Sequence, residues 1–139
     1  MPQVLELITL ADLREDDADA KRISVSVTLE AALDDGRRIL LLDGRGWSSE
    51  LRGPSAAEFP DIWATASEHE MVEQAGFVVG PDEPFGGQTH ADMERSHWDT
   101  LAETLRTYGV PIDGDRLRAL PSRVVLSQRL RERLGVSRQ

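Results

Sequence analysis

The chain contains no cysteine, which excludes disulfide bonds, thiolate metal ligands and cysteine nucleophiles. It also lacks any apolar run near the roughly 20 residues that a membrane-spanning helix needs, and no basic segment leads into an apolar run at its start. From these absences we expect a soluble, cytoplasmic protein that does not contact a membrane.

Positive charge is also scarce, and it is unevenly placed. Residues 1–112 hold 9 basic and 22 acidic side chains, whereas residues 113–139 hold 7 basic and 3 acidic ones, for a net charge of −9. An acidic body repels nucleic-acid phosphates, so nucleic acid is an unfavourable partner. We interpret the basic C-terminal segment as a solvated face or as a segment that docks on the acidic body of its own fold.

Length and composition predict a single domain over residues 1–139. A chain of 139 residues with 40% hydrophobic residues is long enough for one core and too apolar for general disorder.

The first half of the chain shows strand patterns. Residues 4–10 are short and rich in branched side chains, and residues 23–29 alternate strictly between apolar and polar, as in a half-buried strand. The Asp34–Gly36 turn then predicts a hairpin with a strand over residues 37–43. Because Ile39–Leu42 is continuously apolar, we expect this strand in the middle of the sheet, and the glycines of Gly44–Ser49 indicate that the chain then leaves it.

Helix patterns dominate the second half. A helix from Thr89 to Tyr108 has an apolar stripe of Met93, Trp98, Leu101, Leu105 and Tyr108, and Gly109 follows it as a C-terminal cap. We also expect helices over residues 68–74, 113–119 and 122–134, and a short strand over residues 77–79. The predicted fold class is therefore α+β, with an antiparallel sheet of three to four strands covered on one face by the long helix and the C-terminal helices.

The segment Gly76–Thr89 concentrates glycine and proline between two helices, which indicates a shaped loop. Its candidate contact residues are Asp82, Glu83, Phe85, Gly86 and Gly87. The two glycines also precede a helix start, where free N–H groups can hold an anion, although tight entry to the helix is the favoured interpretation. Trp47 is a further contact candidate, and the alternative for it is a local core anchor.

His90, Glu94 and His97 lie four and three positions apart, so a helix would place them on one face. Two imidazoles and a carboxylate are ligands that zinc and non-haem iron use. A divalent metal is therefore the one cofactor that the sequence suggests, and polar groups at the core margin are the favoured alternative.

We favour a non-enzymatic protein-binding module over an enzyme. Its contact surface would be the stretch from Asp61 to Glu103, which holds ten acidic residues and one basic residue, Arg95. Complementary fields accelerate encounter and select the partner, so a basic partner such as a toxin nuclease would suit an immunity or antitoxin-like role.

Two alternatives remain open at this stage. The first is a small enzyme or ligand-binding domain that uses the Gly80–Thr89 loop and the His90, Glu94 and His97 face. The second is a homo-oligomer in which the helix around Arg129–Arg133 docks against an acidic neighbour.

Overall fold

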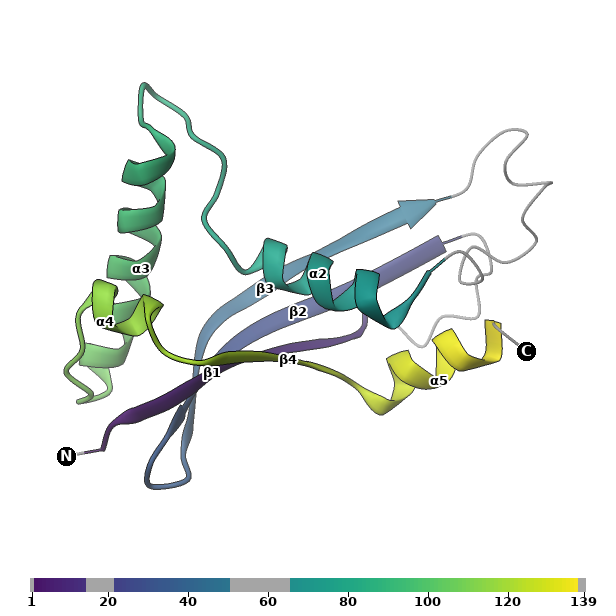
Figure 1. Ribbon diagram of the computed structural model, residues 1–139, viewed down its shortest axis with the longest axis horizontal. Coiled ribbons are helices and arrows are strands. Elements are labelled where there is room, and N and C mark those ends of the chain that lie inside the picture. The colour runs from purple at the N-terminus through teal and green to yellow at the C-terminus, as the bar shows by residue number, and fades with distance from the viewer. Residues whose placement is uncertain (1, 15–21, 51–65, 138–139) are drawn as a thin grey trace.

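The computed structural model describes residues 2–14, 22–50 and 66–137, and it shows an α+β fold (Figure 1). A four-stranded sheet has the order β3-β2-β1-β4. Its strands are β1 (Val4–Leu13), β2 (Arg22–Leu33), β3 (Arg38–Glu50) and β4 (Ser122–Leu126), and the helices are α2 (Glu68–Val78), α3 (His90–Thr107), α4 (Gly114–Arg118) and α5 (Gln128–Ser137).

Strands β1, β2 and β3 form an antiparallel meander, as the sequence predicts. The alternation over residues 23–29 is confirmed, because Ile23, Val25, Val27 and Leu29 are all buried in the core. The turn between β2 and β3 places Gly36 at φ 88°, a conformation that glycine adopts without a steric penalty. Each strand continues beyond its predicted end, since backbone pairing extends past the apolar pattern.

The prediction that Ile39–Leu42 lies in the middle of the sheet is wrong. β3 pairs only with β2 within the described residues, and it is therefore an edge strand there. The register between β2 and β3 shifts on both sides of Leu29, and such bulges place neighbouring residues of one strand on the same side. Leu41 is thus buried and Leu42 packs against the core, whereas Leu40 is 45% exposed.

The chain does not leave the sheet at Gly44–Ser49, contrary to the sequence prediction. These residues continue β3, and Trp47 pairs with Val25 of β2. Gly44 and Gly46 have φ angles of 71° and 150°, so the glycines allow the strand to bend while it stays paired.

The sheet is mixed, because β4 runs parallel to β1 and pairs Leu7 with Ser122 and Ala11 with Leu126. A helix over residues 122–134 was predicted, but residues 122–126 form this strand and the helix begins at Gln128. Ser127 starts the helix, since its side-chain oxygen accepts a hydrogen bond from the Leu130 N–H at 3.2 Å. Leu126, Leu130 and Leu134 are all buried, so their spacing marks the core correctly across two different elements.

Helix α3 confirms the predicted long helix, with Thr89 as its N-cap and Gly109 at φ 82° after its end. Met93, Leu101 and Leu105 are buried, but Tyr108 is 59% exposed and does not belong to the apolar stripe. Tyr108 is the C-cap residue, where the chain has already left the helical path.

Helix α2 shows that two predictions from the sequence are wrong. It does not end before Gly76, and residues 77–78 are its last turn instead of a short strand. Ser67 caps its start by accepting a hydrogen bond from the Glu70 N–H at 3.1 Å. Because Gly76 is not at a positive φ, it continues the helix instead of ending it.

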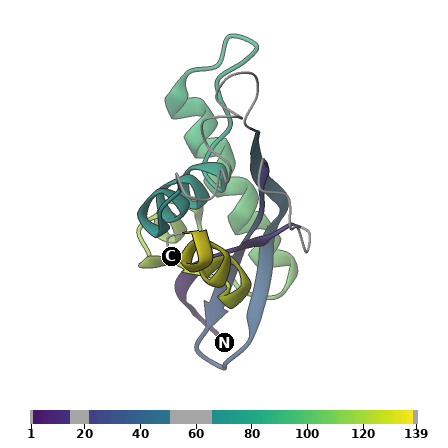
Figure 2. The same cartoon turned by 90° about the vertical axis from the view of Figure 1, so that its right-hand side faces the viewer.

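The helices contribute to one hydrophobic core. α2 contacts β1, β3 and β4, α5 contacts β1, and α3 contacts β3 and α4. Figure 2 shows α2 and α5 on the same side of the strands. The basic C-terminal segment docks on the acidic body, because Arg118, Arg123 and Arg129 pair with Glu94, Glu6 and Asp12 respectively.

Candidate functional site

The loop between α2 and α3 is held to the body of the protein at two points. Nη1 of Arg45 on β3 lies 3.1 Å from Oδ1 of Asp82. The imidazole of His97 on α3 lies close to the backbone carbonyl of Val79, which raises the pKa of His97. The loop that the glycine and proline pattern predicts therefore contacts both a strand and a helix near its start, at Val79 and Asp82.

Two aromatic side chains project from this region. Phe77 in the last turn of α2 is 70% exposed, and Phe85 in the loop is 67% exposed. Gly86 and Gly87 follow at φ 60° and 80°, which turns the chain back toward α3. Large aromatic side chains in water are unfavourable unless a partner covers them, so both are candidate contact residues.

Acidic side chains predominate in the stretch of sequence that contains these aromatic groups. Residues 66–103 hold nine acids and one base, Arg95, and the tenth acid of the predicted surface, Asp61, lies outside the described residues. Four of the acids, Glu68, Glu70, Glu83 and Asp99, have no ion pair or side-chain hydrogen bond within the described part of the chain. The structure thus combines exposed phenylalanines with unneutralised carboxylates.

The start of α3 is occupied by its own side chains. The Thr89 N–H donates to the Asp92 carboxylate at 3.0 Å, and the Asp92 N–H donates to the Thr89 hydroxyl at 3.1 Å. The backbone hydrogen bond from Thr89 is the main cause that holds the pKa of Asp92 below its usual value. Because these donors are used and a carboxylate is already present, the geometry disfavours an anion beside Gly86 and Gly87.

The structure does not bring His90, Glu94 and His97 together as a ligand set. Glu94 pairs with Arg118 of α4 at 2.8 Å, His97 faces Val79, and His90 is exposed. Within residues 2–14, 22–50 and 66–137, no group of three or more His, Cys, Asp or Glu side chains has the arrangement of a metal site.

His97 is the most perturbed polar group of the region. Burial lowers its pKa, and the nearby Arg45 guanidinium lowers it further, while Asp82 opposes both effects. Its Nε2 atom is buried and has no hydrogen-bond partner in the part of the chain that the structure describes. A small hollow of about 150 Å³ beside it is lined by Leu42, Arg45, Asp82, Met93 and Thr100 among others.

Trp47 is partly buried and packs against the core. It lines a hollow with Met71 and Gln74 of α2, so its indole connects β3 with that helix. This position agrees with the local-anchor interpretation of Trp47 and gives no support for a contact role.

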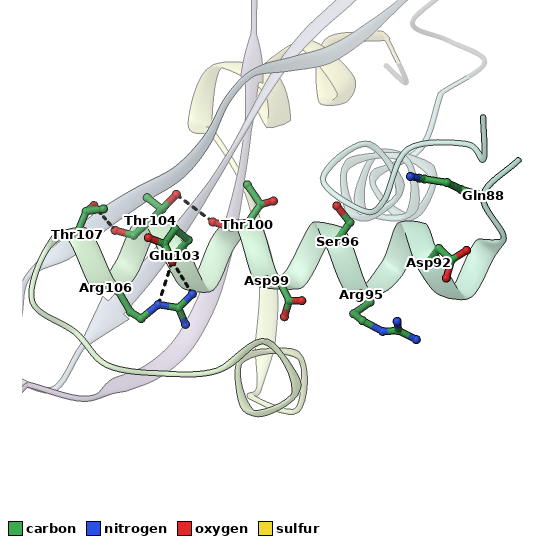
Figure 3. A pocket seen from close by; sticks show the side chains of 10 residues that line it. All are labelled: Gln88, Asp92, Arg95, Ser96, Asp99, Thr100, Glu103, Thr104, Arg106 and Thr107. Carbon is green, nitrogen blue, oxygen red and sulfur yellow. Dashed lines mark hydrogen bonds and ion pairs between the residues drawn. The ribbon is translucent and has the colours of Figure 1, made fainter. Parts of the chain in front are cut away.

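The outer face of α3 is polar and largely self-contained (Figure 3). Arg106 pairs with Glu103 at 2.6 Å, and the hydroxyls of Thr104 and Thr107 donate to backbone carbonyls of the same helix. Figure 3 also shows the Asp92, Arg95 and Asp99 side chains projecting outward from the helix. Neither Arg95 nor Asp99 of this face has an ion pair within the described residues, and Asp99 is a negative charge that a basic partner could use.

The sequence analysis did not predict the positions of two residues of this region. Arg45 was assigned to a segment outside the sheet, and Phe77 to a short strand. A helical signal was present, because Met71 and Ala75 are spaced by four and Val79 follows by four more, and all three are buried. Extending that pattern would have placed Phe77 on the exposed side of α2.

Comparisons with protein-family models, with curated proteins and with solved structures gave no match for this chain. In the described residues, no helix has the length and apolar character needed to cross a membrane.

Proposed function

We propose that the protein is a non-enzymatic protein-binding module whose partner is basic. Its acidic contact surface comprises α2, the loop of residues 79–89 and the exposed side of α3. The main supporting observation is that Phe77 and Phe85 are exposed within residues 66–103, a stretch in which four carboxylates have no cationic partner among the described residues. Aromatic anchors within a charged rim are typical of protein interfaces.

The charge balance favours a basic partner over an acidic or neutral one. An excess of acids over residues 66–103 creates a negative potential that accelerates encounter with a basic surface. The anchoring of the loop by Arg45 and His97 supports binding, because a fixed loop loses less conformational entropy when a partner covers it. An immunity or antitoxin-like protein that covers a basic toxin would have these properties.

The test is capture from an extract of the source cell at low and high salt, followed by affinity measurements with the purified captured protein. We expect a basic protein whose affinity falls with salt and falls in Phe85→Ser and Glu83→Gln. The matched controls are Tyr108→Ser, which removes an aromatic group of similar exposure elsewhere, and Glu132→Gln on α5. Equal losses in the controls, or no basic protein at either salt concentration, would contradict the proposal.

A ligand-binding domain is the second candidate, and one observation favours it: the buried Nε2 atom of His97 lacks a partner among the described residues and lies beside a hollow. In the metal form of this role, protein purified without chelator carries stoichiometric metal, and His97→Gln loses it. If the purified protein contains no metal and added zinc does not change its melting temperature, the metal form of this role is excluded.

A further inference from the structure

Another hollow, of about 320 Å³, lies where the end of α2 meets β3 and the loop. Gly44, Gly46 and Gly80 contribute to its wall without side chains, and Phe77 and Glu83 also line it. The hollow lies within the acidic contact surface, but its aromatic and glycine lining distinguishes it from the purely polar face of α3.

Three independent features of this hollow favour a cation. Phe77 presents an exposed ring, and the face of an aromatic ring attracts positive charge. Glu83 carries a carboxylate with no ion pair among the described residues. The last turn of α2 contains no basic residue, so the negative end of its helix dipole is not compensated by its own sequence.

Arg45 limits how much positive charge the hollow can accept. This guanidinium also lines the hollow, and it pairs with Asp82 at 3.1 Å. Asp82 is therefore already neutralised, and Glu83 is left as the free carboxylate. One added cation balances the charge of Glu83 within the lining, whereas a second would meet repulsion from Arg45, from the first cation and from Arg14, whose Nη2 atom lies close to Gly46.

We propose that this hollow receives one arginine side chain of the basic partner, with its guanidinium over Phe77 and beside Glu83. The inference rests on the proposed function for the source of the arginine. Arginine suits the site because its planar, weakly hydrated guanidinium stacks on aromatic rings and still donates hydrogen bonds to a carboxylate.

The test uses N-acetyl-arginine amide as the probe and the neutral isostere N-acetyl-citrulline amide as its control. Both are titrated into the full chain labelled with ¹⁵N. We expect the amide resonances of Gly44, Gly46 and Gly80 to shift saturably with the arginine probe and much less with the citrulline probe. Phe77→Leu should weaken the binding roughly two- to five-fold, the size of an exposed cation–π contact. Glu83→Gln should also weaken it and reduce its dependence on salt.

Tyr108→Leu is the matched variant, because it removes another exposed aromatic side chain that does not line this hollow. A dispersed amide spectrum of each variant shows that it is folded. Shifts centred on Gly86 and Gly87, equal binding of both probes, unchanged binding in Phe77→Leu, or the absence of any shift would each overturn the inference.

The two proposals fail in distinguishable ways. If the arginine probe binds here but no basic protein is captured, only the proposed function is lost. If a basic protein is captured and its affinity depends on Phe85 and Glu83 but not on Phe77, only the arginine site is lost.

Discussion

Arg45 and Asp82 are 37 positions apart in the sequence, yet Nη1 of Arg45 lies 3.1 Å from Oδ1 of Asp82. This contact joins the edge strand β3 to the loop that follows α2. The same two side chains act in opposite directions on His97, whose pKa Arg45 lowers and Asp82 raises. A strand, a loop and a helix are thus coupled electrostatically.

Replacing Arg45 with glutamine should raise the pKa of His97, because the cation that disfavours the imidazolium is removed. Asp82→Asn should lower the same pKa, which makes the two variants controls for each other. The titration of the imidazole resonances by NMR measures both. Because Asp82 is 66% exposed, water screens the pair, and either variant should change the free energy of unfolding by less than about 1 kcal/mol. A pKa of His97 that moves in neither variant would contradict the coupling.

The lowered pKa of His97 predicts a pH dependence of stability. The unfolded chain binds the His97 proton more readily than the folded protein, so the contribution of this group is complete above the ordinary histidine pKa of about 6.5. It should decline as the pH falls from that value toward the lower pKa of the folded state. Urea unfolding between pH 7 and pH 5 measures this decline.

His97→Gln provides the control for that measurement, because it removes the titrating group. Its stability should change less over the same pH range, even if its absolute stability is lower. Asp12, Asp35 and Asp92 have lowered pKa values, and their effects fall at more acidic pH. Identical slopes in the variant and the wild type would show that His97 is not the group responsible.

Ser127 should contribute to stability through two hydrogen bonds at the junction of β4 and α5. Its hydroxyl donates to Asp12 at 2.6 Å and accepts from the Leu130 N–H at 3.2 Å. Ser127→Ala should cost about 1 kcal/mol for the lost cap, measured by chemical denaturation. It should also raise the pKa of Asp12. Burial is the largest single influence on this pKa and raises it, but the hydrogen bonds of Ser127, Arg129 and Leu13 and the charge of Arg129 together lower it further than burial raises it. An unchanged pKa of Asp12 would contradict this role.

Leu130 tests whether α5 is part of the core. Its side chain is 0% exposed, so Leu130→Ala should reduce the free energy of unfolding by about 2–5 kcal/mol. Arg131→Ala on the exposed side of the same helix should change it by less than about 0.5 kcal/mol. Equal effects of the two variants would mean that α5 does not pack as described.

The elements that the sequence predicts well are those whose local pattern agrees with their environment. The alternation of Ile23–Leu29 marks a strand, and Thr89, Leu101, Leu105 and Gly109 mark the start, stripe and end of α3. The C-terminal strand was missed because Leu126, Leu130 and Leu134 are spaced by four, which imitates one continuous helix. Only the long-range pairing of residues 122–126 with β1 shows that a strand comes first.

In the candidate site too, the sequence predicts local features correctly but not the contacts that come from other elements. The dense glycines and prolines of residues 80–87 correctly locate a shaped loop, and Thr89 correctly predicts the helix cap. The spacing of His90, Glu94 and His97 could not show that Arg118 and Val79 are their neighbours, because those contacts come from other elements. The importance of Arg45 was hidden because bulges, which local patterns do not reveal, keep residues 44–49 within β3.

The parallel pairing of β4 with β1 has a consequence for folding. Ser127 and Asp12, which hydrogen-bond at this junction, are 115 positions apart. Pairings over such separations form late and slowly, because the chain loses the entropy of closing a long loop before the pairing stabilises it. While the ribosome is still synthesising the second half, the β1–β3 meander has an unpaired edge at β1 and an uncovered apolar face. Nascent chains should therefore be prone to aggregate, and a chaperone that shields the meander should raise the yield of folded protein.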